Sequence, residues 1–460
     1  MNRLNLIKSS ALNILRNHQN QLYHFSNKKS IKSPLLARDF IYDRLYNSDS
    51  GYFCKDDLQI GEMKQPINFK ELLGYEEYQR QLSEYYPENA WLTPSEIFKP
   101  YYGMSIANYM QQTIEKMKQQ YQESQLSRKN NSSQAQAKPF DDKIRIVEIG
   151  AGQASAAQSI LMYFKNYEQS YYANLEYTIV EISPQMCKKA LEKLSRDHSK
   201  LIERGQIKFI NEDFVNFKPQ NSGQHHFLLF LEVLDNMPHD RIYKKQNTEE
   251  DIWEKQALVE FTDEFGNEGL KEVLTDIKDP LIQEFINILK TVPTLDHIEE
   301  EKNIQGGVIQ NVIRWLFKQP KDNMFIPTFC LKVLKHINSN IPNHNVIFAD
   351  FDMLKTAESA KMGINAPIVS QKLSKSHEKK DFSTYLVQRG QADIFFPTDF
   401  RLLSHLYKQV CNKKGKALKS YQFMDIYSKE KWAETKSGYN PLKEDFENTS
   451  FFITDVERNK

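Results

Sequence analysis

The stretch Ile144-Arg-Ile-Val-Glu-Ile-Gly-Ala-Gly152 decides the fold of this chain. Its apolar run predicts a buried β-strand, which ends in a carboxylate and continues into a turn with two glycines. Helical spacing of apolar residues follows directly, over residues 153–164. Gly150 and Gly152 let the backbone turn sharply and approach a ligand closely, because neither carries a Cβ atom. In doubly wound α/β sheets such a turn lies at the carboxyl ends of the strands, where ligands bind.

The next predicted strand also ends in a carboxylate, Glu181, and this second acid narrows the choice of ligand. A Glu at this place accepts hydrogen bonds from both hydroxyls of a ribose, so we expect a cofactor that contains a nucleoside. The dinucleotide fingerprint needs a third glycine where this chain has Ser155, and no Walker-type phosphate loop is present. Two glycines alone also occur in ordinary tight turns. The chain here resembles S-adenosyl-L-methionine-dependent methyltransferases, through the ordered set Glu148, Gly150, Gly152 and Glu181.

A third predicted strand, residues 206–210, runs into Asp213 and Phe214. In the methyltransferase fold an acidic residue after the third strand meets the amino group of adenine, while an apolar neighbour covers the ring. Asp213 and Phe214 suit these two roles. An aspartate that follows a strand is also a common turn former, so a purely structural role is the alternative.

The fourth predicted strand, residues 227–231, is apolar throughout, as a parallel strand that is buried on both faces requires. It runs into Glu232, Asp235 and Asn236, at the place where the acceptor meets the methyl group in this fold. We therefore expect these three side chains in the catalytic centre. The alternative is that the acids belong to a solvated loop.

These stretches, together with others, resemble the MidA family of mitochondrial and bacterial methyltransferase-fold proteins. The animal member of that family is a protein-arginine methyltransferase that serves respiratory complex I assembly. The similarity extends from about residue 40 to about residue 455. The elements that carry it are Gly51-Tyr52-Phe53, Thr93-Pro-Ser-Glu96-Ile97, Val180-Glu-Ile182-Ser-Pro184, Glu232-Val-Leu-Asp235-Asn-Met-Pro238 and Asp399-Phe400.

The resemblance implies a Rossmann-like α/β fold with a mostly parallel seven-stranded sheet, a helical N-terminal region and a helical insertion. It also implies S-adenosyl-L-methionine as the cofactor. The implied partner is a protein substrate, namely an arginine of a respiratory complex I subunit. Cofactor binding is expected from Glu96, Glu148, Gly150, Gly152, Glu181, Ile182, Asp213 and Phe214.

The expected roles of the three catalytic candidates follow from the chemistry of such an acceptor. A guanidinium group has a pKa above about 12, so its direct deprotonation is costly. Nearby carboxylates orient it and raise the nucleophilicity of one nitrogen as that nitrogen loses its proton. We expect Glu232 and Asp235 to act in this way. We expect Asn236 to hydrogen-bond the neutral product or the substrate backbone.

Two departures from the family pattern leave a second function open. Ala154 stands where the family has the third glycine of its loop, and the family's Gly-Asp-Phe segment before Thr93 is not recognisable. A catalytically inactive protein that keeps the methyltransferase fold as an assembly or structural component would show such changes. A small-molecule methyltransferase is a third alternative, which the long insertion disfavours because it suits a macromolecular partner.

Composition excludes several other classes. The chain has 460 residues with 61 Lys and Arg against 60 Asp and Glu, and no basic stripe, so a nucleic-acid partner is not expected. The four cysteines, at positions 54, 187, 330 and 411, show no paired spacing, so neither a metal nor a disulfide framework is expected. No apolar run approaches the roughly 18 residues of a membrane-spanning helix.

The N-terminal segment has the composition of a targeting sequence. Residues 1–37 contain no acid, while basic residues are spread among Leu, Ile, Ser and Asn. Such an amphipathic, acid-free segment is typical of a mitochondrial transit peptide, and we expect a mitochondrial protein, in the matrix. A mobile basic tail is the alternative, although the first acid, Asp39, coincides with the start of the family resemblance.

The rest of the chain divides by composition and periodicity. We expect a mainly helical N-terminal region at 38–118, a polar linker at 119–143, the first half of the core at 144–240, a helical insertion or lid at 241–340 and the second half of the core at 341–460. The insertion follows the fourth strand, so it either covers the catalytic mouth or merely buttresses the sheet.

Shorter elements are expected within the later units. Helical spacing of apolar residues predicts helices at 279–289 and 308–317 in the insertion. In the second half of the core we expect a buried strand at 345–351, a long loop at 352–391 and the last strands at 393–396 and around 421–427.

Overall fold

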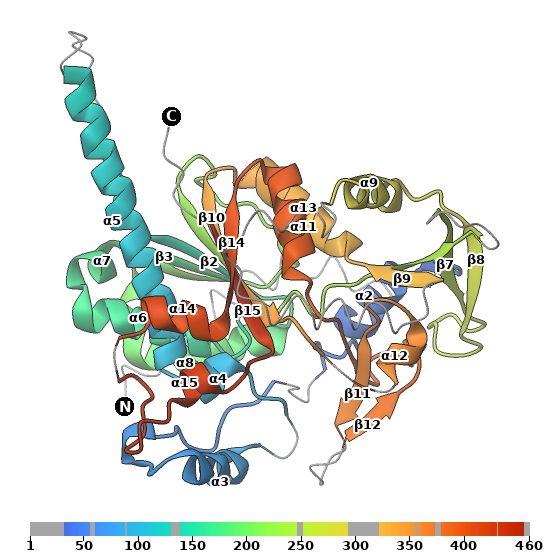
Figure 1. Ribbon diagram of the computed structural model, residues 1–460, viewed down its shortest axis with the longest axis horizontal. Coiled ribbons are helices and arrows are strands. Elements are labelled where there is room, and N and C mark those ends of the chain that lie inside the picture. Colours follow the sequence, from blue (N-terminus) through green and yellow to red (C-terminus); the bar gives the residue numbers. More distant parts are fainter. Residues whose placement is uncertain are drawn as a thin grey trace.

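A seven-stranded sheet forms the centre of the fold, with the strand order β14-β15-β10-β5-β2-β3-β4 (Figure 1). Its strands are β2 (Arg145–Ile149), β3 (Glu176–Val180), β4 (Ile207–Ile210), β5 (His226–Leu231), β10 (His344–Phe351), β14 (Gly415–Lys419) and β15 (Thr449–Thr454). The computed structural model describes residues 32–454 apart from 56–59, 88–89, 130–138, 246–251, 293–321, 355, 357, 373–378 and 430.

The central sheet is mixed rather than uniformly parallel. The neighbours from β10 through β5, β2 and β3 to β4 pair in parallel. At the other edge, β15 pairs antiparallel with both β10 and β14. The expected mostly parallel sheet is therefore found in five adjoining strands, while the strand that ends the described chain runs the opposite way. All six residues of β5 are buried, as its apolar run predicts.

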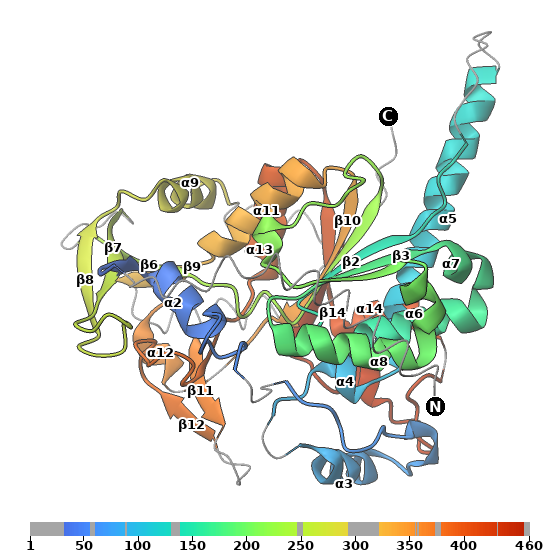
Figure 2. The same ribbon diagram turned by 180° about the vertical axis from the view of Figure 1, so that it is seen from behind.

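Helices cover both faces of this sheet, as Figures 1 and 2 show from opposite sides. Successive strand residues point to opposite faces, and therefore each strand contributes to two cores. Ile146 and Phe227 share one core with α5 (Tyr101–Lys129), α6 (Ser155–Tyr167) and α8 (Pro184–Glu203). Val147 and Leu228 share the other core with α11 (Thr328–Asn340) and α13 (Phe400–Cys411). Burial on both faces explains the continuous apolar strands of the sequence.

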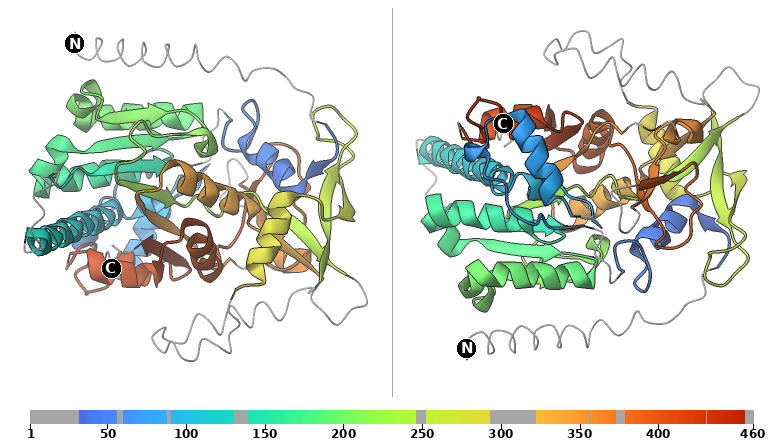
Figure 3. Two further views of the ribbon diagram at one scale, coloured as in Figure 1. Left: turned by 90° about the horizontal axis from the view of Figure 1, so that it is seen from above. Right: turned by 90° about the horizontal axis from the view of Figure 1, so that it is seen from below.

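The N-terminal region holds β1 (Leu35–Leu36), α2 (Ala37–Tyr46), η1 (Phe69–Glu71), α3 (Tyr75–Tyr85), α4 (Pro94–Ile97) and the long α5, which projects from the body in Figure 1. In Figure 3, α2 lies between the central sheet and the strands of the insertion. Arg38 in its first turn donates to Asp240 at 2.6 Å and to Asp279 at 2.6 Å, and Asp240 also accepts from the Thr328 hydroxyl. This largely buried ionic network fixes α2 against the insertion.

The prediction of a helical insertion is wrong in part, because its described residues form strands as well as helices. The region 241–340 contains β6 (Asp240–Lys244), β7 (Trp253–Glu260), β8 (Lys271–Asp276), α9 (Pro280–Leu289), β9 (Asn323–Ile326) and α11. β6 to β9 and β1 form a second, antiparallel sheet. In β7, Ala257 and Val259 are buried while Leu258 between them is not, which is the two-residue period of a strand. The helix expected at 279–289 corresponds to α9, and the one at 308–317 lies outside the described residues.

Three expectations for the last third of the chain are also corrected. The expected loop at 352–391 contains α12 (Ser359–Met362), β11 (Ile368–Lys372) and β12 (Lys379–Phe382), and β13 (Asp393–Phe395) joins these two strands instead of the central sheet. The expected strand at 421–427 is α14 (Ser420–Tyr427), with Phe423 and Met424 buried and Tyr421 and Ile426 exposed. That spacing is helical, and a short apolar run alone does not distinguish helix from strand.

Candidate active site

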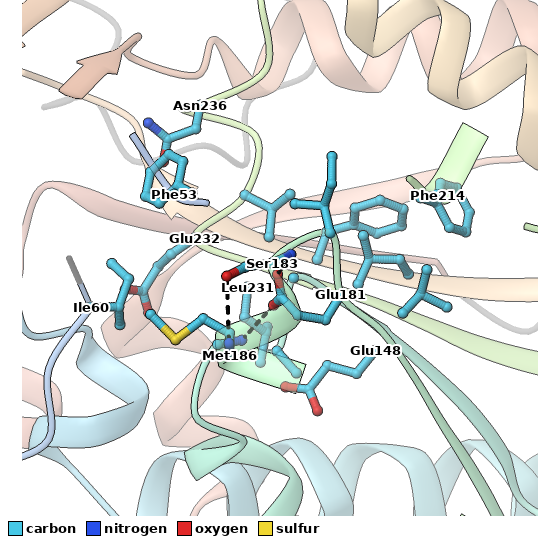
Figure 4. Close-up of a pocket in the computed structure, with 18 of the residues that line it drawn as sticks. Phe53, Ile60, Glu148, Glu181, Ser183, Met186, Phe214, Leu231, Glu232 and Asn236 are labelled. Atoms are coloured by element: carbon cyan, nitrogen blue, oxygen red, sulfur yellow. Dashed lines mark hydrogen bonds between the residues drawn. The ribbon is translucent and has the colours of Figure 1, made fainter. Parts of the chain in front are cut away.

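A cleft opens at the carboxyl ends of β2, β3 and β5, where the sequence motifs meet. It encloses about 1240 Å³ of empty space, part of it open to solvent. The sequence-predicted residues that line it are Glu96, Glu148, Gly150, Gly152, Glu181, Ile182, Asp213, Phe214, Glu232 and Asn236. Figure 4 shows several of them around the cleft. Asp235, which we expected to act in catalysis, is not among the lining residues.

The two glycines of the loop after β2 are needed for different reasons. Both have a left-handed backbone, with φ of +65° at Gly150 and +53° at Gly152. A Cβ atom on Gly150 would lie 2.9 Å from Cγ2 of Val233, whereas one on Gly152 would meet nothing nearer than Cγ2 of Ile60 at 3.8 Å. Gly150 therefore allows the loop to pack against the chain after β5, and Gly152 leaves its side of the cleft free of a side chain.

The third loop position, Ala154, keeps the backbone of a glycine. Its φ is 61° and its ψ is 35°, and its side chain is fully buried. A left-handed alanine costs roughly 1 kcal/mol, and its buried methyl group contributes about 0.8 kcal/mol in return. The strain of this left-handed alanine and the burial of its methyl group therefore nearly offset each other.

We expect A154G to change the free energy of unfolding by less than about 1 kcal/mol, since the relieved strain and the lost methyl contact nearly cancel. The loop keeps its shape, so cofactor affinity should stay within about threefold of wild type. Urea unfolding and calorimetric titration test both numbers. In the matched variant A154V a β-branched side chain meets the same left-handed backbone, and a stability equal to that of A154G would contradict the argument.

Glu181 is held by the backbone of the glycine loop and of its own turn. Its Oε2 accepts the Gly152 N–H at 3.0 Å and its Oε1 accepts the Ser183 N–H at 2.9 Å. Burial raises the pKa of Glu181 to about 7, and these two N–H groups limit the rise. Each carboxylate oxygen has a second lone pair, so the group can accept two further hydrogen bonds from a ligand in the cleft.

Cofactor affinity is expected to depend on the protonation of Glu181. Below a pKa of about 7 the carboxyl group holds a proton and offers fewer lone pairs to ribose hydroxyls, whereas above it both oxygens accept. Binding therefore favours the ionised group and releases a proton, and the affinity should rise about tenfold between about pH 6 and about pH 8. Calorimetry at both pH values measures this. E181Q has no titrating group here, and an equal rise in E181Q would assign the effect elsewhere.

Glu148 is buried near the end of β2 and hydrogen-bonds to the neighbouring strand. Its Oε2 accepts the Tyr177 hydroxyl at 2.7 Å, and burial raises its pKa to about 8. In Figure 4 it lies apart from Glu232 and Asn236. Glu148, near the end of β2, is thus joined to the second residue of β3.

Asp213 and Phe214 lie on the cofactor side as well. Asp213 Oδ1 accepts the Val215 N–H at 3.1 Å, and its Oδ2 accepts the hydroxyl of Tyr42 at 2.6 Å. The ring of Phe214 is buried, with its edge-on neighbour Phe230 at a centroid distance of 5.3 Å. The turn-forming role that the sequence left as an alternative for Asp213 is therefore present, and its carboxylate also faces the cleft.

Glu96 is engaged by protein groups on both oxygens. Oε1 accepts the Met63 N–H at 2.8 Å and the Lys99 ammonium at 2.5 Å, and Oε2 accepts the Ser155 hydroxyl at 2.5 Å. Lys193 donates to that same hydroxyl at 3.1 Å. The carboxylate thus joins α4 to the first residue of α6, and we assign Glu96 to positioning the loop that precedes α6.

Glu232 lines the cleft and carries a buried carboxylate oxygen without a partner among the described residues. It follows β5 with a left-handed backbone, φ 55°. The Ser95 N–H donates to its carboxylate, but the buried Oε1 has no hydrogen-bond partner among the described residues. Burial raises its pKa well above the usual value, and the charge of Asp350 adds to the rise. An unpaired buried acceptor is costly, so this atom is a place for a donor from a ligand.

Asp235 lies outside the lining of the cleft, whereas Asn236 lines the cleft with its side-chain amide bound to a neighbouring strand. Asp350 at the end of β10 binds the N–H groups of Leu234 and Asp235 at 2.8 and 3.1 Å. The Asn236 amide donates to Asp393 Oδ1 at 2.8 Å. Burial raises the pKa of Asp235 well above its ordinary value, and those of Asp350 and Asp393 to about 7. A cluster of buried carboxyl groups therefore stands behind Glu232.

The sequence reasoning missed an aromatic wall that faces these acids. Its members in the cleft are Tyr42, Tyr46, Phe53 and Phe329. Tyr42 and Tyr46 lie one turn apart on α2, and the Tyr46 hydroxyl donates to the Asn236 carbonyl at 3.1 Å. Tyr46 stacks on Phe53 at a centroid distance of 5.7 Å. The spacing of the two tyrosines marks one helix face, but nothing local connects that face with a loop far along the chain.

A metal site and a membrane-spanning helix are both absent from the described part of the chain. Within it, no group of three or more His, Cys, Asp and Glu side chains could hold a metal ion. None of the helices that the structure describes is long and apolar enough to cross a membrane.

Comparison with known proteins agrees with this geometry. A family model for a putative S-adenosyl-L-methionine-dependent methyltransferase matches residues 106–417. A crystal structure of a Burkholderia thailandensis protein bound to S-adenosyl-homocysteine has a TM-score of 0.52 at 11% identity, over 92% of this chain and 88% of that one. An uncharacterized protein from the same organism has a TM-score of 0.51 at 12% identity, over 92% and 87%. No curated protein matches this chain.

Proposed function

We infer, because this chain belongs to the family of putative S-adenosyl-L-methionine-dependent methyltransferases, that it methylates an arginine side chain of a protein. Family membership supports the cofactor and the class of reaction. The proposal adds the acceptor, a guanidinium nitrogen. It also adds the setting: a mitochondrial protein of the matrix that modifies a respiratory complex I subunit. Each addition rests on its own observation.

The residues of the cleft fit the cofactor. Glu181 offers two free lone pairs at the edge of the sheet where a ribose is expected, and Asp213 offers acceptors where an amino group is expected. Gly152 leaves room between them. When bound, the cofactor supplies an electrophilic methyl group on a sulfonium. The remaining task of the protein is to align a nucleophile with that methyl group and to exclude water.

The unpartnered Oε1 of Glu232 is the observation that carries the choice of acceptor. A guanidinium has five N–H donors and a fixed positive charge, so it would satisfy this oxygen and lower the raised pKa of the carboxyl group. As the nitrogen–methyl bond forms, that nitrogen must lose a proton, and the ionised Glu232 carboxylate is placed to take it. The methylated guanidinium then leaves with its positive charge unchanged.

The aromatic wall supports a planar cation as the acceptor. The stacked rings of Tyr46 and Phe53 line the same cleft as Glu232. Guanidinium groups are planar and weakly hydrated, and they bind aromatic faces more often than ammonium groups do. An acid on one side and aromatic rings on the other therefore favour an arginine over a lysine.

The sequence supports the cellular setting. Residues 1–37 have the acid-free composition of a mitochondrial transit peptide. The resemblance to the MidA family, which includes a protein-arginine methyltransferase for complex I assembly, supports a complex I subunit as the substrate.

The test incubates the full chain with S-adenosyl-L-methionine and isolated complex I subunits, followed by peptide mass spectrometry. Methylarginine on one subunit, formed by wild type and absent with E232Q, is the expected result. Cofactor binding is measured on the same preparations. If the wild-type chain binds the cofactor and methylates no arginine, the acceptor assignment fails while the cofactor assignment stands.

A second candidate is a non-catalytic assembly component that keeps the fold. The observation that favours it is the Asn236 amide, which already donates to Asp393 Oδ1 and to the Ile394 carbonyl. Cells that carry the chain with Glu181→Ala separate the two functions. Complex I that assembles normally in those cells would favour the assembly component, and a loss of assembly would favour the enzyme.

A further inference from the structure

The hydroxyl of Tyr42 enters the cofactor side of the cleft from α2, outside the motifs of the methyltransferase core. It donates to Asp213 Oδ2 at 2.6 Å, while the Val215 N–H donates to Oδ1 at 3.1 Å. The Asp213 carboxylate is thus held from two sides. Burial, and then the charge of Asp213, raise the pKa of Tyr42 well above its ordinary value, so the hydroxyl stays protonated and remains a donor.

The position of Tyr42 is fixed by contacts on both sides of its helix. The ring lies 5.7 Å from Phe329 of α11 and 5.3 Å from Tyr46, measured between centroids. Below it, Arg38 holds α2 to Asp240 and Asp279 through hydrogen bonds of 2.6 Å. β1, directly before α2, pairs with β7. The hydroxyl therefore reaches Asp213 from a rigid support rather than from a loose terminus.

We propose that Tyr42 makes this cleft selective for a purine nucleoside with a 6-amino group, by fixing the Asp213 carboxylate as a hydrogen-bond acceptor. An ionised carboxylate has about four lone-pair positions, and the two hydrogen bonds of Asp213 use two of them. A 6-amino group donates to a remaining position. A 6-oxo group at the same place is itself an acceptor, so its lone pairs face those of the Asp213 carboxylate and the affinity for a 6-oxo purine is lower.

The Tyr42 hydroxyl contributes to this selectivity because it fixes the orientation of the Asp213 carboxylate from one side while the Val215 N–H fixes it from the other. Without that donor the carboxylate turns more freely, and its acceptor positions are no longer held toward a 6-amino group. Tyr42 is thus a positioning residue, and its effect is on the discrimination between two ligands. The proposal concerns the cofactor side and is independent of the methyl acceptor.

The experiment is calorimetric titration of the full chain with S-adenosyl-homocysteine and with its deaminated analogue, S-inosyl-homocysteine. We expect wild type to prefer the adenosine compound by at least about 30-fold, the equivalent of about 2 kcal/mol. Y42F should lower this ratio at least about fivefold. D213N should lower or reverse it, and Y42F together with D213N should add little, because both act on one contact.

A matched control comes from a second Tyr–Asp pair outside the cleft. The Tyr78 hydroxyl donates to Asp445 Oδ2 at 2.8 Å, and Y78F removes the same chemical group there. The ratio in Y78F is expected to equal that of wild type. A folded Y42F that keeps the full ratio overturns the proposal. A wild-type ratio below about threefold overturns it without any variant, since the cleft would then not discriminate. An equal fall in Y78F would also overturn it, because general destabilisation would explain both.

Discussion

Glu181→Ala is expected to weaken the binding of S-adenosyl-L-methionine by at least about 100-fold. The carboxylate accepts the N–H groups of Gly152 and Ser183 and keeps a lone pair on each oxygen for a ribose hydroxyl. Hydrogen bonds to a charged group contribute about 1.5–3 kcal/mol each, so the loss of two costs about 3 kcal/mol or more, which is over two decades in affinity. Titration calorimetry measures the difference directly.

The control for this prediction lies on the same strand. Glu176 begins β3, at the opposite end from the cleft, and pairs with Lys143 at 2.5 Å. E176A removes an identical side chain, and its cofactor affinity should stay within about threefold of wild type. Comparable losses in E181A and E176A would show that the strand, and not the carboxylate in the cleft, determines binding. Undiminished binding by E181A would refute the assignment of the ribose site.

Replacement of Glu232 by glutamine is expected to lower the rate of methyl transfer about 10²–10⁴-fold, the range for loss of a positioned general base. Cofactor affinity should change by less than about threefold, since Glu181 and Asp213 remain. Gln keeps the size of the side chain and can still accept the Ser95 N–H. It has no charge for a cationic acceptor and cannot take up its proton. Single-turnover rates with radiolabelled cofactor separate this effect from binding.

Asp235→Asn is the matched control, because Asp235 shares the loop of Glu232 and is buried without lining the cleft. Its rate should fall at most about tenfold, through altered charge behind Glu232. If D235N lost methyl transfer while E232Q remained active, the general base would be Asp235 and the role of Glu232 would be disproved.

The binding motifs were open to prediction because each is local. The apolar run with Glu148 near its end, followed by two glycines, predicts both a strand and the turn after it. Glu181 and Asp213 likewise follow predicted strands. Parallel strands place their carboxyl ends along one edge, so residues far apart in the sequence gather there once the strand order is known. This rule predicts that Glu181 and Glu232 lie at one cleft, and both line it.

The segments whose structure was predicted wrongly contain no local motif of this kind. The apolar spacing at 279–289 and 308–317 predicts a helical insertion, but β6 to β9 acquire their partners from one another and from β1 far upstream. Tyr421 to Tyr427 is an apolar run that suits either a helix or a strand, and packing against α5 and α15 accompanies the helix that forms. Strand pairing across long separations is a property of the assembled chain, and single-sequence periodicity does not record it.

The sequence by itself determined the methyltransferase core, the glycine loop and the acids that follow its strands, because short-range geometry and continuous apolar burial dictate them. Only the tertiary structure decided which acid faces the cleft. Glu232 and Asp235 are three residues apart in one irregular loop, whose Leu234 and Asp235 N–H groups are bound by Asp350 of a distant strand. It also decided the place of Tyr42. Arg38 of the same helix pairs with Asp240 and Asp279, more than 200 residues further along the chain, and these ion pairs hold the helix at the cleft. Such contacts follow from three-dimensional packing, which no local pattern encodes.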